Sequence, residues 1–293
     1  MEQKTMNNIG KVRAAVGYIE NHLTEKLDLE TIARGLRYSK YHLHRCFSET
    51  LGVTIGDYLQ RRRLTEAARR LVFTNEPIIG VALEAGYESQ QAFSAAFKSM
   101  YKYPPNRFRE AGIFYPLQLA LDLDENLAAF PPDDAAFERR ITFALEEDIP
   151  RWMELVRLVA DAFPFLDEDE HRRTAEYCIR KKQAFILKEG SRAAGIMIFF
   201  RDTGSIGFLG VHPLCRGRGI ARAFLDKTMD ELLPDRSTIT TTTYRAGDKA
   251  DRGSRTALER LGFTQGELLT EFGYPTQRFS ISSRPRNMRQ FHG

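Results

Sequence analysis

Length, composition and charge limit the kinds of protein that this chain can be. Its 293 residues exceed the usual size of one domain, about 100 to 200 residues, and a hydrophobic fraction of 42% is enough for ordinary buried cores. The three cysteines, Cys46, Cys178 and Cys215, are far apart and lack the spacing of a disulfide framework or a zinc site. We therefore expect two domains, a reducing compartment and no bound metal.

Two further features of the composition concern location and partners. No run reaches the roughly 18 apolar residues of a membrane span, and the first residues lack the apolar core of a signal peptide, so we expect a cytoplasmic protein with no membrane partner. The net charge of +4 is uneven, because residues 1–112 hold 17 Lys and Arg against 12 Asp and Glu. A basic first part favours a polyanion such as double-stranded DNA as a partner.

Residues 8–110 show helical spacing of apolar residues and contain an internal repeat. The segment LETIARGLRYSKYHLHRCFSETLG is echoed by PIIGVALEAGYESQQAFSAAFKSMYK, with Ala33 matching Ala82 and Phe47 matching Phe97. The second copy has a turn one residue longer, which contains Gly86. Each copy has the order helix, tight turn, serine N-cap, helix, which predicts a helix-turn-helix unit.

The segment TIGDYLQRRRLTEAARRLVF between the two copies is predicted to form one connecting helix. About 18 residues at 1.5 Å per residue give a length of roughly 27 Å. Successive major-groove segments on one face of DNA lie about 34 Å apart. A rigid connector of this size could hold two recognition helices on neighbouring grooves.

Residues 8–110 resemble the DNA-binding domain of the AraC/XylS family of bacterial transcription regulators. The resemblance rests on residues at the matching positions of both copies and of the connector. Two departures are Val81, where isoleucine is common, and Lys102, which replaces a usual glycine. The matching residues are Leu29, Ile32, Ala33, Ser39, Leu43, Arg45, Phe47, Arg63, Leu64, Ala67, Ile79, Ala82, Gly86, Tyr87, Phe93, Phe97, Lys98 and Pro105.

Within the second helix of each copy, the apolar residues point inward and leave one polar face outward. Arginine and lysine read guanine edges and glutamine reads adenine, so this face is a candidate for base contacts, with a solvated helix face as the alternative. The arginines of the connector are expected to position phosphates. The candidate base-contacting residues are Lys40, Tyr41, His44 and Arg45 in the first copy and Gln90, Gln91, Ser94 and Lys98 in the second; the phosphate candidates are Arg61, Arg62, Arg69 and Arg70.

Residues 113–137 combine prolines with an acidic cluster and no sustained period, which predicts a linker, partly docked through Phe114, Tyr115 and Leu117. The pattern then alternates between strands and helices, so we expect a multidomain protein in which an all-α double helix-turn-helix domain (1–112) precedes an α/β mixed-sheet domain (138–283) and a flexible tail (284–293). Strands are predicted at 141–145, 185–187, 194–200, 205–211 and 237–243 and near Leu268 and Phe279, and helices at 149–163, 171–181, 220–233 and 254–261.

The strand SIGFLGV, the turn HPLCRGRG and the helix IARAFLDKTMDELL form the most informative stretch of this second domain. A glycine-rich turn before a helix lets backbone N–H groups approach an anion, and the helix dipole adds to the attraction, whereas a turn without a ligand would have the same composition. The stretch resembles the acetyl-CoA motif of the GNAT acyltransferase superfamily, in which Arg216, Gly219 and Ala221 match its pattern. The resemblance covers about residues 140–281 and includes Leu261-Gly262-Phe263.

The resemblance to GNAT enzymes implies acetyl-CoA, or another acyl-CoA, as cosubstrate or ligand. It assigns the backbone of Arg216, Gly217, Arg218, Gly219, Ile220 and Ala221 to the pyrophosphate, and Val211 to the pantetheine arm. Asp251 stands where relatives commonly carry asparagine and is assigned to the same cofactor site.

Catalytic residues are harder to identify. Acyl transfer to an amine needs a base and an acid, and many relatives use a tyrosine at the position of Leu258. Tyr244 and Tyr274 are possible substitutes, with buried or stacking tyrosines as the alternative. His212 is too close to the cofactor turn to be assigned as the base, and Cys215 is expected to be a turn residue and not a nucleophile, since no Cys–His arrangement is near.

The sequence therefore predicts a DNA-binding transcription regulator whose GNAT-like domain binds acyl-CoA and either acetylates an amine or acts as a sensor. One alternative is an N-acetyltransferase of a small amine or antibiotic that controls its own operon. Another is a regulator whose ligand-binding domain is catalytically inactive, which Leu258 favours slightly. The operator, the acyl acceptor and the oligomeric state are open at this point.

Overall fold

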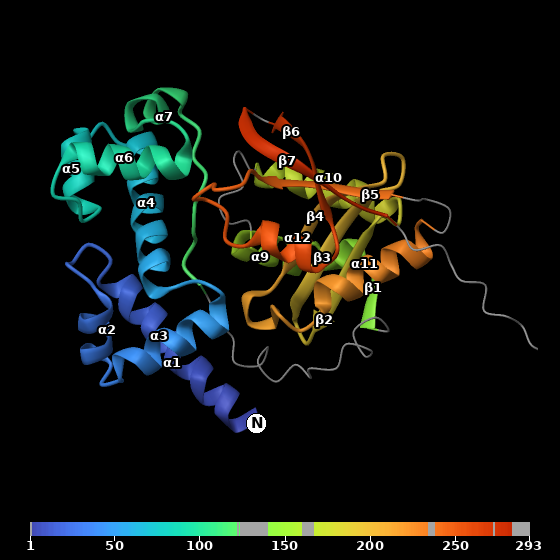
Figure 1. The fold of residues 1–293 in the computed structure, drawn as a ribbon, viewed down its shortest axis with the longest axis horizontal. Helices are drawn as coiled ribbons and strands as arrows, with labels where there is room; N and C mark the ends of the chain where they lie inside the picture. The colour runs from blue at the N-terminus through green and yellow to red at the C-terminus, as the bar shows by residue number, and fades with distance from the viewer. Residues whose placement is uncertain are drawn as a thin grey trace, which may run out of the picture.

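The computed structural model describes residues 2–121, 123, 140–159, 167–233, 238–271 and 273–282. A helical N-terminal region and a region built on a β-sheet lie side by side (Figure 1). The expected fold class, an all-α double helix-turn-helix domain before a mixed-sheet α/β domain, is confirmed. Residues 124–137 of the predicted linker and 284–293 of the predicted tail lie outside the described residues, and the domain boundaries stay predictions.

The N-terminal region consists of two helix-turn-helix units joined by one long helix. Helices α2 and α3 form the first unit and α5 and α6 the second, and α4 runs between them (Figure 1). One more residue separates the helices of the second pair, as the repeat predicts. The helices are α1 (Glu2–Asn21), α2 (Leu29–Gly35), α3 (Lys40–Leu51), α4 (Ile55–Phe73), α5 (Ile78–Glu84), α6 (Gln90–Tyr101) and α7 (Pro105–Ala111).

Side chains at the N-cap positions begin several of these helices. Asp28 caps α2 by accepting a hydrogen bond of 2.7 Å from the backbone N–H of Thr31, and this bond lowers the pKa of the Asp28 carboxyl. Ser89 caps α6 in the same way through the N–H of Ala92. Ser39 occupies the N-cap position of α3 without a side-chain cap hydrogen bond. The predicted serine positions are therefore correct, and one of the two serines makes the capping bond.

Each helix-turn-helix unit has its own apolar core. Leu43 and Phe47 of α3 are completely buried against α1 and the start of α4. In the second unit, Phe93 and Phe97 are equally buried, and Phe97 stacks on Tyr101 with ring centroids 4.4 Å apart. Since these side chains anchor the inner faces, the opposite faces of α3 and α6 remain at the surface.

The C-terminal region is a seven-stranded mixed sheet in the order β1-β2-β3-β4-β5-β7-β6. All neighbouring strands are antiparallel except β4 and β5, which are parallel and pair through Ser205 and Thr240. This pairing lies at the start of β4, so β4 and β5 are unpaired toward Val211, where β4 ends. The strands are β1 (Ile141–Phe143), β2 (Ala184–Glu189), β3 (Arg192–Phe200), β4 (Ser205–Val211), β5 (Thr238–Tyr244), β6 (Thr264–Glu271) and β7 (Tyr274–Ser282).

Helices pack on both faces of this sheet. Ile196 and Ile198 of β3 point into a cluster with α9 and α10, whereas Met197 and Phe199 belong to a cluster with α11. Alternation along β3 thus buries both faces, as expected for a central strand of an α/β sheet. The remaining elements are the 3-10 helices η2 (Glu146–Asp148) and η3 (Pro213–Cys215) and the helices α9 (Ile149–Val159), α10 (Glu168–Arg180), α11 (Ile220–Glu231) and α12 (Ser254–Arg260).

The described part of the predicted linker packs against the protein. Tyr115 and Leu117 are buried, and the hydroxyl of Thr65 on α4 accepts hydrogen bonds from the N–H groups of Leu117 and Gln118 at 3.0 and 3.1 Å. Docking through Tyr115 and Leu117 therefore agrees with the expectation. These contacts fix residues 115–118 against α4.

An ion pair joins the two regions at a position that the sequence marked as unusual. Lys102, which replaces a usual glycine, lies at the C-cap of α6 with a left-handed φ of 66°. Its ammonium contacts Asp248 Oδ1 at 2.6 Å, and the Asp248 side chain is only 5% exposed. A glycine would adopt this φ with less strain but could not form the ion pair.

Candidate nucleic-acid interface and ligand-binding turn

The outer face of α3 carries the residues that the sequence proposed for base contacts in the first unit. Lys40, Tyr41, His44 and Arg45 are all exposed, and Tyr41 is 86% exposed although it is a large aromatic residue. Lys40 forms an exposed ion pair with Glu30 at 3.1 Å, a type of contact that stabilises little in water. The face is thus accessible to a ligand as large as DNA.

The outer face of α6 is similar but less charged. Gln90, Gln91 and Lys98 are exposed, and Ser94 is half-buried. Gln90 and Gln91 occupy the first turn of α6, and the N-terminal turns of recognition helices are the parts that usually reach base edges. Both helices therefore present polar side chains where a major groove could accept them.

Two connector arginines do not fit the expected contact with phosphate. Arg61 and Arg62 are 4% and 6% exposed. Arg62 donates to both carboxylate oxygens of Glu20, with the shortest distance 2.8 Å, and also to Glu66 and the backbone oxygen of Gln118. Burial alone would lower the pKa of the Arg62 guanidinium. The hydrogen bonds and the negative charge of Glu20 have a larger effect, so the pKa of Arg62 is raised. We therefore correct the expectation: these two arginines hold the fold together.

The other two connector arginines lie nearer the surface. Arg69 is exposed and lies 3.5 Å from Glu66 in an ion pair between successive turns of α4. Arg70 is half-buried and pairs with Glu76 and Glu84 at the start of the second unit. Arg69 is therefore the better remaining candidate on α4 for a phosphate contact.

The turn that the sequence proposed for ligand binding connects β4 to α11 through η3. Gly217 and Gly219 both have left-handed backbone conformations, with φ of 74° and 79°. Gly219 is the N-cap of α11 and contributes no capping side chain. The first N–H groups of a helix have no partner within that helix, so this turn places N–H donors at the positive end of a helix dipole.

Side chains around this turn have structural contacts of their own. Arg216 Nε lies 3.4 Å from the backbone oxygen of Val211, and both residues are half-buried. His212 is buried, and its Nδ1 accepts a hydrogen bond of 3.2 Å from the N–H of Leu214. Burial raises the pKa of the Cys215 thiol to about 11, which keeps the thiol protonated at neutral pH. Cys215 is thus a turn residue, as expected, and His212 occupies the N-cap position of η3.

The turn also packs against the first helix-turn-helix unit. Helix η3 contacts α3 directly. Leu214 and Cys215 belong to the same buried cluster as Cys46 and Leu51 of α3. The proposed anion-binding turn and the proposed base-reading helix are therefore connected through packed side chains.

The tyrosines considered for catalysis lie together near the domain interface. The rings of Tyr244 and Tyr274 are 5.9 Å apart, and Tyr274 is 4% exposed. The Tyr274 hydroxyl donates to Asp248 Oδ2 at 2.9 Å, and burial together with the Asp248 charge raises the pKa of Tyr274. Leu258, at the position of the usual tyrosine, is half-buried against the core. Tyr274 is thus held in its protonated form, which does not suit a general base.

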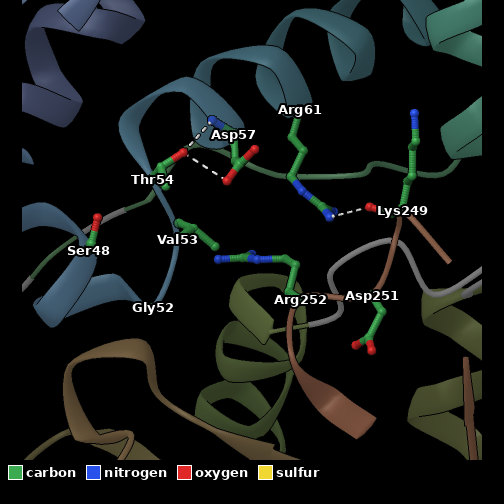
Figure 2. Close-up of a pocket in the computed structure, with 9 residues that line it drawn as sticks. All are labelled: Ser48, Gly52, Val53, Thr54, Asp57, Arg61, Lys249, Asp251 and Arg252. Carbon is green, nitrogen blue, oxygen red and sulfur yellow. Dashed lines mark hydrogen bonds between the residues drawn. The ribbon is translucent and has the colours of Figure 1, made fainter. Parts of the chain in front are cut away.

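Asp251, which the resemblance assigned to the cofactor site, lies just before α12. Its Oδ1 accepts hydrogen bonds from the N–H groups of Gly253 and Ser254 at 3.0 and 2.8 Å, at the start of α12. It also lines a pocket between the two regions, together with residues from the α3–α4 turn (Figure 2). These two hydrogen bonds help to position α12.

Sequence reasoning missed Arg252 and Arg255, and it missed the contacts that Arg61 makes across this interface. Arg61 Nη2 donates to the backbone oxygens of Lys249 and Ala250 at 3.1 and 3.0 Å, and Arg252 Nη1 donates to Gln118 Oε1 at 2.6 Å. Inside the second region, Arg255 Nη1 donates to Gln277 Oε1 at 2.6 Å. For this interface the sequence carried one signal, Lys102 at a position where glycine is usual, and that residue pairs with Asp248.

Within the described ranges, no group of three or more His, Cys, Asp or Glu side chains could hold a metal ion. No helix of the described chain is both long and apolar enough to cross a membrane.

Comparisons with known proteins match the two regions separately. A model described as a helix-turn-helix domain matches residues 32–111, and one described as the acetyltransferase (GNAT) family matches residues 152–263. The multiple antibiotic resistance protein MarA of Escherichia coli is 37% identical over 98 residues, which cover 33% of this chain and 77% of MarA. The transcriptional regulator Rob of Salmonella typhimurium is 37% identical over 120 residues, which cover 39% of this chain and 42% of Rob.

The matches to solved structures are also partial. An acetyltransferase of the GNAT family from Bacillus cereus is 16% identical with a TM-score of 0.39, covering 49% of this chain and 96% of that protein. Among the sequence relatives, the HTH-type transcriptional regulator YbfP of Bacillus subtilis is 40% identical over 98 residues, which cover 33% of this chain and 33% of YbfP. The chain thus spans less than half the length of YbfP and Rob.

Proposed function

Because the chain belongs to the AraC-type family of helix-turn-helix transcription regulators and carries a GNAT domain, we propose that it reads specific DNA sequences under the control of an acyl-CoA. The single observation that carries this proposal is the packing of η3, in the ligand-binding turn, against α3. A regulator of this kind acts on chromosomal DNA, so a cytoplasmic location is part of the proposal.

The DNA-binding part of the proposal uses the exposed faces of α3 and α6. Arg45 and Lys40 can donate to guanine edges, and Gln90 and Gln91 can pair with adenine. Helix α4 has 19 residues, or roughly 28 Å at 1.5 Å per residue, which suits two recognition helices in successive major grooves. His44, Tyr41, Ser94 and Lys98 complete the proposed contact surface.

The ligand-binding part uses the turn before α11. A pyrophosphate at this point would accept hydrogen bonds from the N–H groups of residues 216–221 and would interact favourably with the helix dipole. The left-handed glycines support this, because Gly217 and Gly219 turn the backbone without a side chain over the donors. Val211 pairs with Gly195 of β3 but lies at the end of β4 that does not pair with β5, where its backbone could bond an extended pantetheine arm. Acetyl-CoA or another acyl-CoA is therefore the proposed ligand.

A sensor role agrees better with the tyrosine geometry than catalysis does. Leu258 has no ionisable group, and the Tyr274 hydroxyl already donates to Asp248. Without a placed acid or base, bound acyl-CoA would persist and report its own concentration. Acetylation of a small amine is the second candidate, since Tyr244 is only half-buried at the end of β5. Release of CoA from acetyl-CoA with a panel of primary amines distinguishes the two.

The sensor proposal is tested by measuring DNA affinity with and without acetyl-CoA. The DNA is a duplex selected from a random pool by the full-length protein. We expect acetyl-CoA to change the Kd for this duplex by about fivefold or more, which is the lower end of typical allosteric coupling. Ala221→Glu should remove the effect by placing a carboxylate beside the pyrophosphate, whereas Thr142→Glu, an equal charge at an exposed position of β1, should keep it.

Three outcomes would count against parts of this proposal. An unchanged DNA affinity in the presence of bound acetyl-CoA would refute the coupling. Absence of acetyl-CoA binding to the wild-type protein would refute the ligand. Rapid CoA release with an amine would replace the sensor by the acetyltransferase.

A further inference from the structure

Two segments of the GNAT domain leave the same end of its sheet and reach different helix-turn-helix units. Strands β4 and β5 pair in parallel through Ser205 and Thr240, so the segments that follow them begin at one end of the sheet. Helix η3 follows β4 and contacts α3 of the first unit. The loop after β5 carries Asp248 and Ala250, which contact the second unit. The GNAT domain therefore contacts both units.

The contact with the second unit centres on a carboxylate whose side chain is 5% exposed, that of Asp248. Its Oδ1 accepts hydrogen bonds from the Lys102 ammonium at 2.6 Å and from the N–H of Ala250 at 2.8 Å, and its Oδ2 accepts one from the Tyr274 hydroxyl at 2.9 Å. Ala250 is itself buried in the apolar cluster that contains Phe97 of α6. Since Lys102 is the C-cap residue of α6, these contacts fix the C-terminal end of that helix.

Helix α4 is the other connection between the two units (Figure 1). Ile55 and Tyr58 in its first half belong to the core of the first unit, whereas Leu64 and Leu71 in its second half belong to the core of the second. Among the described residues, neither α2 nor α3 packs extensively on α5 or α6. The angle between the units therefore depends on how each one packs on its own end of α4. A second connection through a packed sheet restricts that angle.

From these contacts we infer that the GNAT domain fixes α3 and α6 relative to each other and thereby sets the half-site spacing that the protein accepts on DNA. Helix η3 holds α3, the pair of Lys102 and Asp248 holds the end of α6, and the sheet keeps these two points at a constant separation. Lys102 and Asp248 thus determine specificity without contacting DNA. The inference rests on the proposed reading of DNA by α3 and α6 and does not require acyl-CoA.

The position of Lys102 allows a variant that breaks this contact and leaves α6 intact. Its φ of 66° is a left-handed conformation that glycine adopts without the steric cost of a Cβ. Lys102→Gly therefore keeps the end of the helix and removes the ammonium. Asp248→Asn removes the charge on the other side of the pair and keeps the shape of the side chain. Because the two variants change the net charge in opposite directions, a shared effect cannot come from overall attraction to DNA.

The test compares the affinity for a duplex selected by the full-length protein with the affinity for the same duplex after one base pair is inserted between the half-sites. The insertion moves one half-site by about 3.4 Å and rotates it by about 35°. It should weaken wild-type binding about tenfold or more, the value of one lost base contact. In Lys102→Gly and Asp248→Asn the loss should be about threefold or less, below the cost of one mismatched base pair. Glu267→Gln, which removes an exposed ion pair with Arg278, should behave as wild type.

A second measurement of the same variants needs no DNA. Nitroxide labels on Glu49→Cys of α3 and Ala95→Cys of α6, both at exposed positions, report the distance between these helices by pulsed electron paramagnetic resonance. The three native cysteines are buried. Lys102→Gly should widen the distance distribution about twofold or more, as expected when a domain contact is released.

Two results would overturn the inference. One is an equal distance distribution with and without Lys102→Gly, and the other is an equal effect of the inserted base pair on wild type and on both variants. Failure of the wild-type protein to select any duplex would refute the proposed reading of DNA and, with it, the half-site spacing. The label distances would then still show whether the GNAT domain fixes the two helices.

Discussion

A carboxylate in the first turn of α11 should separate the stability of the fold from its affinity for acyl-CoA. Ala221 is half-buried and is the second residue of this helix, which begins directly after the left-handed Gly219. In Ala221→Glu the new carboxylate interacts favourably with the helix N-terminus, by about 0.3 to 1 kcal/mol. The ligand-free variant should therefore unfold at nearly the wild-type temperature.

The same carboxylate should weaken ligand binding strongly. Two unit charges 4 Å apart repel by about 4 kcal/mol at an effective dielectric constant of 20, and each 1.4 kcal/mol is a factor of ten. We therefore expect the Kd for acetyl-CoA to rise about 100-fold or more. At a concentration 100 times the wild-type Kd, the ligand stabilises wild type by about 2.7 kcal/mol but the variant by only about 0.4 kcal/mol.

Differential scanning calorimetry with and without acetyl-CoA measures this difference. A domain of about 150 to 250 residues shifts by roughly 2 to 4 °C per kcal/mol, so the ligand should raise the wild-type Tm by about 5 to 11 °C and the variant Tm by about 1 to 2 °C. Thr142→Glu should respond as wild type does. An equal Tm rise in wild type and Ala221→Glu would refute the assignment of the pyrophosphate to this turn.

Three further predictions concern the DNA-binding face, the buried Arg62 and the half-buried His171. Arg45→Ala should reduce discrimination between selected and random duplexes by about tenfold in fluorescence anisotropy, the value of one base contact; unchanged discrimination would exclude Arg45 from base reading. Arg62→Ala should cost about 3 to 5 kcal/mol in urea unfolding, because it leaves the Glu20 carboxylate without its buried partner, and a loss within 1 kcal/mol would contradict the proposed structural role. Burial lowers the pKa of His171 to about 4 from an unfolded value of about 6.5. The unfolded chain thus binds the proton more readily, so about 3 kcal/mol of stability is present above pH 6.5 and is lost as the pH falls to about 4; His171→Gln should flatten this dependence in urea titrations.

Local features of the protein could be predicted from the sequence because they depend on neighbouring residues. The strand at 205–211 has the predicted bounds, and the repeat correctly placed α3 and α6 after their serine N-caps. The glycines of the turn before α11 are left-handed, as a close backbone approach requires. Hydrophobic spacing also identified the inner faces of both recognition helices, since a 3.6-residue period shows which side chains share a side.

Contacts between distant segments depended on the tertiary structure alone. Periodicity places Arg61 and Arg62 on a polar face of α4, but it cannot show that residues 118 and 249–250 cover that face. The ion pair of Lys102 and Asp248 joins residues 146 positions apart, and the pocket between Arg61 and Arg252 forms only when the two regions dock. The spacing of residues in a helix shows which side chains share a face of that helix. Tertiary packing decides whether such a face contacts solvent, a carboxylate or another domain.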